Sequence, residues 1–253
     1  MIELHGKKAL ITGGSRGIGR ATAILLAQAG ADVAINYVRN DAAAAEVKKV
    51  IEEFGRQALT IRADISREEE ARELVEKVAA EWRRLDYVVN NAGIWTYGEM
   101  GQMSRQVWEE TMRLNLDAVF YVINAVVPLM QKQGGGVIVN VSSTAAVRGE
   151  AYHSHYAASK GALHSLTKSL AVELAPYGIR INCVAPGWVD TDMCAEVFAD
   201  PEFRRSVQNS IPLKRIPPPE DIAGPILFLL SDLARHITGT VLHVNGGSVL
   251  CGS

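Results

Sequence analysis

The sequence predicts an α/β fold in which a doubly wound parallel sheet of about seven strands carries helices on both faces. Two observations predict it. Short apolar segments with the length of strands alternate with longer segments of helical periodicity along the chain. The first strand–helix–strand unit also contains a glycine-rich turn, which is typical of sheets that bind a nucleotide at one edge.

The expected strands are apolar runs, and the expected helices lie between them. We expect strands near residues 7–12, 32–37, 57–62, 86–90, 136–142, 179–185 and 240–244. We expect helices near residues 17–29, 41–55, 67–83, 104–132, 154–176 and 219–231. We find no repeat or linker that divides the chain, so residues 1–253 are expected to form a single domain.

The composition excludes several classes of function. With 48% hydrophobic residues and a formal net charge of −2, the chain is suited to a large core and not to a nucleic-acid surface or a polybasic membrane anchor. We see no apolar leader, and no segment approaches the length of a membrane span. Cys183, Cys194 and Cys251 lack metal-ligand spacing, so we expect no metal site and a reduced, cytoplasmic location.

The glycine-rich turn follows the first expected strand and opens the first expected helix. It reads Gly13-Gly14-Ser15-Arg16-Gly17-Ile18-Gly19. Glycine lets a backbone turn tightly and approach a ligand closely, and the free N–H groups of a helix N-terminus attract a pyrophosphate. We therefore interpret the segment as a dinucleotide-binding loop of a Rossmann-like fold. An ordinary turn is the alternative interpretation.

Tyr156 and Lys160 form the candidate catalytic pair. Four residues apart on an expected helix, the phenol and the ammonium share one face. A tyrosine normally loses its proton near pH ~10, and lowering this pKa to ~7 requires roughly 4 kcal/mol. One cation about 4 Å away supplies about that amount, so Lys160 is expected to lower the pKa of Tyr156. By itself, the spacing also fits a tyrosine packed at a helix edge beside a solvated lysine.

Several motifs in order resemble the short-chain dehydrogenase/reductase family over nearly all of the chain. Gly13, Gly17 and Gly19 have the glycine spacing of that family. Asn90-Asn91-Ala92-Gly93 matches a second motif, and Ser143 precedes Tyr156 by thirteen residues, as the catalytic serine of the family does. The segment from Pro186 to Thr191 resembles the one that closes over the nicotinamide.

The resemblance implies a role for each catalytic residue. Tyr156 would donate a proton to a carbonyl oxygen during reduction and accept one from the alcohol during oxidation. Ser143 would orient the substrate oxygen, and Lys160 would also bond the nicotinamide ribose. Asn115 would anchor a water that links Lys160 to solvent. The expected catalytic residues are Asn115, Ser143, Tyr156 and Lys160.

The cofactor preference follows from charge. The strand at 32–37 ends without the acid that NAD-selective sites place there, whereas Arg16 and Arg39 lie where a 2′-phosphate would bind. NADP(H) is therefore favoured over NAD(H). The alternative is that both arginines are solvated and either cofactor is accepted. The expected cofactor-binding residues are Gly13, Ser15, Arg16, Gly17, Ile18, Gly19, Asn36, Tyr37, Arg39, Asp64, Ile65, Asn91, Ala92, Gly93, Tyr156, Lys160, Pro186, Gly187, Val189 and Thr191.

Within the family, the sequence is most similar to 3-oxoacyl-[acyl-carrier-protein] reductases of fatty acid biosynthesis. This implies a 3-oxoacyl thioester substrate and an acyl carrier protein as a partner. Glucose, sugar-alcohol or other ketone dehydrogenases are the alternative, and a catalytically inert NADP(H)-binding sensor or scaffold is an alternative of another class. Relatives commonly pair through the helices expected at 104–132 and 154–176 and form tetramers, which implies a homotetramer. The alternative is that these helices are buried within the monomer.

The segment 192–217 is expected to cover the substrate. Its apolar residues fit either a cover for an acyl chain or the core face of a lid helix. These residues are Met193, Val197, Phe198, Phe203 and Val207. His153 and His155 flank the catalytic region and are secondary candidates for substrate contact.

Overall fold

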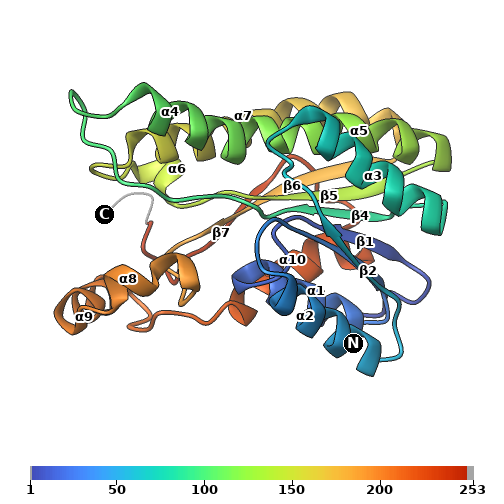
Figure 1. Ribbon diagram of the computed structural model, residues 1–253, viewed down its shortest axis with the longest axis horizontal. Coiled ribbons are helices and arrows are strands. Elements are labelled where there is room, and N and C mark those ends of the chain that lie inside the picture. The colour runs from blue at the N-terminus through green and yellow to red at the C-terminus, as the bar shows by residue number, and fades with distance from the viewer. Residues whose placement is uncertain (1, 250–253) are drawn as a thin grey trace.

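The computed structural model describes residues 2–249, and these contain a seven-stranded parallel sheet between two layers of helices (Figure 1). The strands are β1 (Lys8–Ile11), β2 (Asp32–Tyr37), β3 (Ala58–Arg62), β4 (Tyr87–Asn90), β5 (Gly136–Val141), β6 (Ile179–Pro186) and β7 (Val241–Val244). Their spatial order is β3-β2-β1-β4-β5-β6-β7. The order reverses at β1, so the crevice beyond the carboxyl ends of β1 and β4 is the expected ligand site of such a sheet. The predicted fold class is confirmed.

Ten α-helices occur within the described residues, and six segments were predicted to be helical. The helices are α1 (Gly17–Gln28), α2 (Asp41–Glu53), α3 (Glu68–Trp82), α4 (Arg105–Met112), α5 (Ala118–Gln133), α6 (Ala145–Arg148), α7 (Ser154–Leu174), α8 (Ala195–Phe198), α9 (Pro201–Ser210) and α10 (Glu220–Leu230). The single helix predicted at 104–132 is instead two α-helices joined by one π-helical turn, Arg113–Asp117. The short helix α6 was not predicted, and α8 and α9 lie in the segment 192–217, for which a lid helix was one of the two alternatives.

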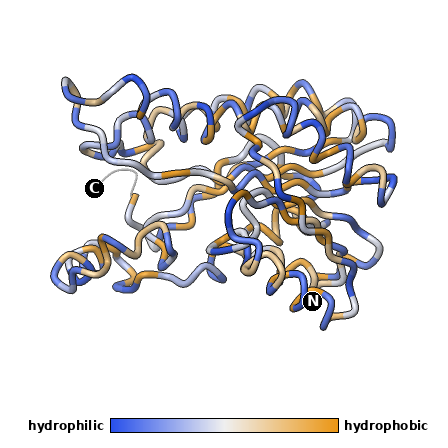
Figure 2. The backbone as a smooth tube through the Cα atoms, in the orientation of Figure 1, coloured by the Kyte–Doolittle hydropathy of each residue, from blue (hydrophilic) through white to orange (hydrophobic). Residues whose placement is uncertain are grey.

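Alternate residues of the central strands pack into two separate hydrophobic cores, one on each face of the sheet. Ala9 and Ile11 of β1 pack on the side of α1, α2 and α10, whereas Leu10 packs on the side of α3, α5 and α7. Figure 2 shows the corresponding pattern, with hydrophobic residues concentrated in the sheet and hydrophilic residues on the outer helices. Because both faces are covered, the strands are nearly continuous apolar runs, and only their ends are free to carry polar side chains.

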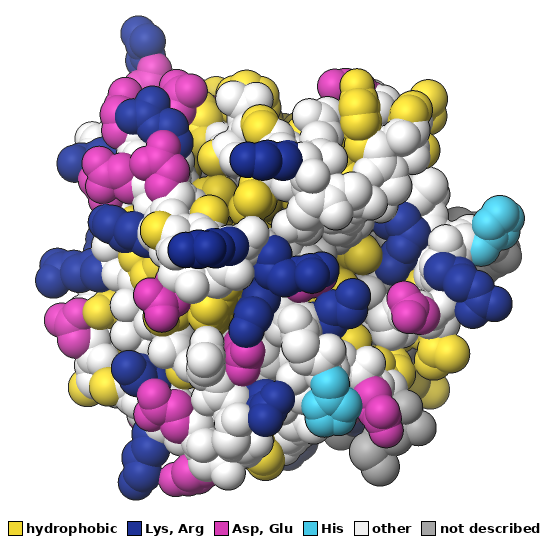
Figure 3. Space-filling model, turned by 90° about the vertical axis from the view of Figure 1, so that its right-hand side faces the viewer, with side chains coloured by type: hydrophobic (Ala, Val, Ile, Leu, Met, Phe, Trp, Pro, Cys, Tyr) yellow, Lys and Arg dark blue, Asp and Glu magenta, His cyan; other side chains and the backbone are white. Residues whose placement is uncertain are grey.

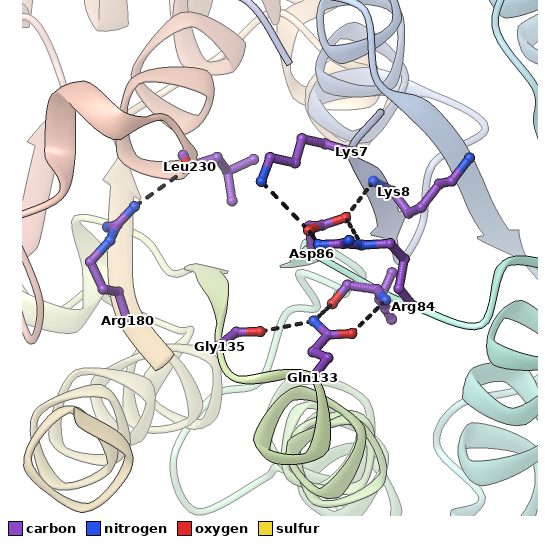
Figure 4. Close-up of polar contacts among 9 residues, drawn as sticks. Lys7, Lys8, Arg84, Asp86, Gln133, Gly135, Arg180 and Leu230 are labelled. Atoms are coloured by element: carbon purple, nitrogen blue, oxygen red, sulfur yellow. Dashed lines mark hydrogen bonds and ion pairs between the residues drawn. The ribbon is translucent and has the colours of Figure 1, made fainter. Parts of the chain in front are cut away.

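The starts of the strands are fixed by a polar network (Figure 4). The buried carboxylate of Asp86 accepts a hydrogen bond from the backbone N–H of Lys8 at 2.9 Å and pairs with the side chain of Arg84. Gln133 donates to the carbonyls of Leu85 and Gly135, both at 2.8 Å. These bonds fasten α5 to the sheet at the end opposite the carboxyl edge, so the edge that holds the glycine loop rests on a fixed frame.

The outer surface mixes charges of both signs. On the face shown in Figure 3, basic and acidic side chains both occur among uncharged and hydrophobic ones. Surface ion pairs between neighbouring helical turns, such as Lys48 with Glu52 and Lys77 with Glu73, belong to this mixed surface. Such a surface is typical of a water-facing side.

The prediction that no segment approaches the length of a membrane span is wrong, because one helical run among the described residues is long enough and apolar enough to cross a membrane. The continuous helical run Arg105–Gln133 has 29 residues and reaches a mean hydropathy of 1.3 over 18 of them, of which 39% are buried. Its apolar side chains Val122, Val126 and Met130 are fully buried in the core shared with the sheet. The run therefore serves this fold as a core helix, which alternation along the sequence could not distinguish from a spanning one.

Candidate functional site

The glycine loop between β1 and α1 is packed so closely that side chains would not fit. A Cβ on Gly19 would lie 2.3 Å from the carbonyl oxygen of Gly13, and a Cβ on Gly14 would lie 2.6 Å from the side chain of Ile35. Gly13 and Gly17 have positive φ angles of 62° and 52°, a region that favours glycine. The loop thus leaves a backbone surface at the N-terminus of α1, where N–H groups favour an anion.

The segment after β4 is bonded directly to this loop. Thr12 Oγ1 accepts hydrogen bonds from the backbone N–H groups of Asn91 at 3.0 Å and Ala92 at 3.1 Å. The Asn91 side chain donates in return to the carbonyls of Thr12 and Gly13. Two motifs that are almost 80 residues apart in sequence therefore form one rigid corner at the carboxyl ends of β1 and β4.

A single cavity of about 560 Å³ runs along this edge and is lined by almost all of the predicted residues. The predicted residues that line it are Gly13, Ser15, Arg16, Gly17, Ile18, Asn36, Tyr37, Arg39, Asp64, Ile65, Asn91, Ala92, Gly93, Ser143, Tyr156, Lys160, Pro186, Gly187, Val189 and Thr191. Gly19 and Asn115 do not line it. Gly19 contributes the close packing of α1 against the loop, since its Cβ would meet the Gly13 carbonyl.

Asn115 lies behind the cavity wall, in the π-helical turn between α4 and α5. Its buried side chain accepts from the Ile94 backbone N–H at 2.8 Å and donates to the Ile94 carbonyl at 2.9 Å. It also donates to Ser159 Oγ on α7 at 3.2 Å. A Cβ on Gly93 would lie 3.1 Å from Asn115 Oδ1 and 3.2 Å from Lys160 Nζ. The side chains of Asn115 and Lys160 therefore both border the space beside Gly93. π-Turns of this kind often occur at functional sites.

Tyr156, Lys160 and Ser143 lie together at the end of the cavity near β5. Tyr156 is 9% exposed and Lys160 is 4% exposed. The Lys160 ammonium donates to the Val141 carbonyl at 2.9 Å and lies 5.9 Å from the centre of the Tyr156 ring. Ser142, not Ser143, fastens α7 to the sheet: its hydroxyl donates to the Lys160 carbonyl at 2.9 Å. Ser143 lines the cavity, and its Oγ accepts a hydrogen bond from the Ala145 backbone N–H at 3.1 Å.

The pKa values of this pair are set mainly by burial. Burial raises the pKa of Tyr156 to about 12, a hydrogen bond from Ser143 opposes that rise, and the charge of Glu150 adds to it. Burial lowers the pKa of Lys160 to about 8. The expected lowering of the Tyr156 pKa by Lys160 is therefore not found in this structure, because the ammonium is bonded to Val141 and both groups are desolvated.

The segment 192–217 forms a lid with its own small core. Phe198 and Val207 are 7% and 6% exposed and pack together with Cys194 and Ile211. Of the five apolar residues considered for this segment, only Met193 lines the cavity. In Figure 1, α8 and α9 stand apart from the sheet on the side of β7. Most of these residues therefore belong to the core face of the lid and do not cover the substrate cavity.

Sequence reasoning missed the residues that line the substrate end of the cavity. They are Trp95, Arg148, Glu150 and Trp188. The ring of Trp95 stacks on His153 at 4.3 Å and meets Trp188 edge-on at 5.8 Å. His153 therefore supports the wall without lining it, and the buried His155 is bonded to Thr96. Trp95 comes two residues after Gly93 of one recognised motif, and Trp188 lies within the segment from Pro186 to Thr191, so these positions were the available signal.

Comparison with known proteins gives the family. The family profile described as enoyl-(acyl carrier protein) reductase matches residues 13–248. An L-rhamnose 1-dehydrogenase (NAD(P)(+)) of Sphingomonas sp. is 42% identical over 245 residues, which are 96% of each chain. The chain belongs to the short-chain dehydrogenase/reductase family. A 3-oxoacyl-[acyl-carrier-protein] reductase of Staphylococcus epidermidis is 39% identical to this dehydrogenase/reductase, over 95% of its chain and 98% of the relative.

A solved structure from Beutenbergia cavernae has the same fold. It is described as an NAD(P)-dependent gluconate 5-dehydrogenase with bound NADP at low occupancy, and it matches with a TM-score of 0.93 and 38% identity over 98% of each chain. The chain is thus an NAD(P)-dependent oxidoreductase.

Its own residues fit a nicotinamide dinucleotide. The side-chain-free glycine loop would hold the pyrophosphate, and Asn36, Tyr37 and Asp64 line the adjoining part of the cavity. Asp64 accepts from the N–H and hydroxyl of Ser66, which fixes its carboxylate at the cavity wall. Among residues 2–249 no group of three or more His, Cys, Asp or Glu side chains is arranged to hold a metal ion.

Proposed function

We propose that the chain interconverts a secondary alcohol and a carbonyl compound using NADP(H), with Tyr156 as proton donor and acceptor. The observation that carries this proposal is that one cavity is lined by both the glycine loop and the group Tyr156, Lys160 and Ser143. A nicotinamide bound there supplies or accepts the hydride. Because burial raises the pKa of Tyr156, its phenol is protonated at neutral pH and can donate to a carbonyl oxygen. Oxidation of an alcohol requires the phenolate, so we expect that direction to be faster at alkaline pH.

Two arginines support the preference for NADP(H). Arg16 and Arg39 line the cavity beside Asn36 and are exposed, and within the described residues neither forms an ion pair. Their guanidinium groups are therefore available to a 2′-phosphate, which binds well to such planar donors.

We expect Arg16→Ala and Arg39→Ala to raise the KM for NADPH by roughly 10- to 100-fold each, because each removes charge-assisted hydrogen bonds. The KM for NADH should change by less than about threefold. Initial rates with both cofactors measure this. Arg20→Ala is the matched control, since Arg20 lies one turn further along α1 and pairs with Glu46. Equal losses for NADPH and NADH would show that the arginines do not read the 2′-phosphate.

For the substrate, we favour a small polyhydroxylated compound such as an aldose. Support comes from the cavity wall, where Trp95 and Trp188 offer aromatic faces while Glu150 and Arg148 offer polar groups. Aromatic faces accept the C–H surface of a sugar ring, and charged groups accept or donate hydrogen bonds to hydroxyls. The lid contributes little apolar lining because Phe198 and Val207 are used in its own core.

Reduction of a 3-oxoacyl thioester is the second candidate. Met193, which lines the cavity and is 46% exposed, could contact an acyl chain, and the Staphylococcus epidermidis relative is a reductase of this kind. An acyl carrier protein would then be the partner, and the role would lie in fatty acid biosynthesis.

The deciding experiment compares initial rates of NADP⁺ reduction with a panel of aldoses, L-rhamnose and D-glucose included, with NADPH oxidation by an acetoacetyl thioester. We expect tyrosine-dependent turnover of at least one aldose, with kcat/KM at least tenfold above that for the thioester. Turnover of the thioester alone would assign the chain to the second candidate. Tight NADPH binding without any turnover would instead identify an inert NADP(H)-binding sensor or scaffold.

We further propose a cytoplasmic homotetramer that pairs through α4, α5 and α7. Support comes from large apolar side chains left exposed on these helices: Trp108 is 40%, Phe120 49% and Val172 79% exposed. Burial of such side chains between subunits is favourable.

A further inference from the structure

The Glu150 side chain carries a carboxylate that is mostly buried in the wall of the reaction cavity. Glu150 lies in the turn between α6 and α7, lines the reaction cavity, and has a side chain that is only 18% exposed. Its charge is close enough to Tyr156 to raise the pKa of the phenol. A carboxylate that is mostly removed from water is unfavourable unless hydrogen-bond donors compensate for the lost hydration.

Within the described residues we find no hydrogen-bond donor for this carboxylate. The nearest cationic candidate is Nδ1 of His153, at 4.0 Å from Glu150 Oε1. That nitrogen is 2.9 Å from the Ala151 carbonyl, which can only accept, so its N–H is already used there. Arg148 lines the same cavity but forms no ion pair with Glu150. The carboxylate therefore faces the cavity with its acceptor capacity free.

The turn that carries Glu150 is held firmly. The Glu150 carbonyl accepts from the His153 N–H at 3.1 Å, and the Tyr152 carbonyl accepts from the Gly98 N–H at 2.8 Å. Tyr152 has a φ of 63°, which is rare for a bulky residue and persists only where surrounding contacts impose it. The backbone that carries Glu150 is thus fixed at the cavity wall.

An aromatic platform lies beside this carboxylate. Trp95 lines the cavity, and its ring is fixed by His153 stacked at 4.3 Å with an interplanar angle of 2°. A ring-shaped substrate lying on Trp95 with its reacting oxygen at Tyr156 would present its neighbouring hydroxyl to the same wall. That hydroxyl is the donor that Glu150 lacks.

We propose that Glu150 is a specificity-determining residue that accepts a hydrogen bond from the hydroxyl on the carbon next to the reacting one. This rests on the proposed function, and it deepens it by naming the group on the substrate that is recognised. A charged acceptor of this kind selects vicinal diols over simple alcohols and repels substrates that carry a negative charge near the reacting carbon.

The test uses two probes that differ by one hydroxyl group, cyclohexanol and cis-1,2-cyclohexanediol, with NADP⁺ as the second substrate. We expect the wild-type protein to prefer the diol by roughly 10- to 100-fold in kcat/KM, as a hydrogen bond to a charged group implies. In Glu150→Ala the ratio of the two kcat/KM values should fall to within about threefold of unity. Glu150→Asp, which keeps the carboxylate, should retain part of the preference.

Glu109→Gln is the matched control, because Glu109 is exposed on α4, pairs with Arg105 and does not line the cavity. Its diol-to-alcohol ratio should equal that of the wild type. A ratio that stays high in Glu150→Ala would overturn the inference while leaving the proposed function intact, and loss of both rates in parallel would show a merely structural role. If the wild type oxidised neither probe nor any aldose, the proposed function itself would be wrong.

Discussion

Replacing Tyr156 with phenylalanine is expected to lower kcat/KM by about 10³-fold or more while changing the Kd for NADPH by less than about threefold. Phenylalanine keeps the ring, which is 9% exposed and packed in the cavity wall, and removes only the hydroxyl. A positioned acid or base contributes roughly 10²- to 10⁴-fold to the rate, and the hydroxyl that remains beside the site, that of Ser143, is an aliphatic alcohol and a much weaker acid than a phenol. Initial rates and a fluorescence titration with NADPH measure the two effects.

Tyr152→Phe is the control for this change. Tyr152 lies four residues earlier, is 56% exposed and stacks on Tyr97 at 5.5 Å, so loss of its hydroxyl should leave the rate within about twofold of wild type. Strong residual turnover in Tyr156→Phe, with Tyr152→Phe unchanged, would remove Tyr156 from the chemistry. Loss of NADPH binding together with turnover would point to a damaged site instead.

The sheet could be predicted well because its strands have both faces buried. Each strand is then an apolar run that stands out from the polar turns around it, as in β2 (Asp32–Tyr37). The π-helical turn Arg113–Asp117 could not be predicted, since one extra residue in a helix hardly alters the apolar spacing. A lid helix in 192–217 was only one of two alternatives, although Asp200 caps the N-terminus of α9 and Pro201 is its first residue, because the surface of α9 is mostly polar.

The residues at the glycine-loop end of the candidate site could be predicted to lie together because they are contiguous in short motifs. Asn91 and Gly13 were both expected in it, and hydrogen bonds join their segments. The substrate half could not, since the role of Glu150 depends on which donors surround it in three dimensions. For the same reason, spacing placed Lys160 beside Tyr156 but gave no measure of burial, which dominates both pKa values.

Lys160→Met is expected to lower kcat by at least roughly 10²-fold and, in the cofactor-free protein, to remove a destabilising buried charge. Lys160 is 4% exposed, and burial lowers its pKa from 10.5 to about 8. That difference corresponds to roughly 3 kcal/mol of unfolding free energy at 1.36 kcal/mol per pKa unit. Methionine fills similar volume without a charge, although it loses the bond to the Val141 carbonyl, so the gain at pH 7 should be smaller, about 1–2 kcal/mol.

The pH dependence of the unfolding free energy distinguishes the effect of the buried Lys160 charge from the effect of losing its hydrogen bond to Val141. Below pH 8 the lysine is protonated in both the folded and the unfolded chain, so wild type bears the full unfavourable effect. Between about pH 8 and 10.5 the folded protein releases this proton while the unfolded chain retains it, so the stability of wild type rises relative to Lys160→Met. Urea unfolding of both proteins at pH 7, 9 and 10.5 should show the difference in unfolding free energy changing by about 3 kcal/mol, so that an advantage of the variant of about 1–2 kcal/mol at pH 7 becomes a disadvantage of similar size at pH 10.5. Lys168→Met replaces an exposed lysine of the same helix and is the control. Its unfolding free energy should differ from that of wild type by the same amount at all three pH values. A pH-independent difference for Lys160→Met would mean that Lys160 is not desolvated, and the electrostatic description of the catalytic pair would then have to be abandoned.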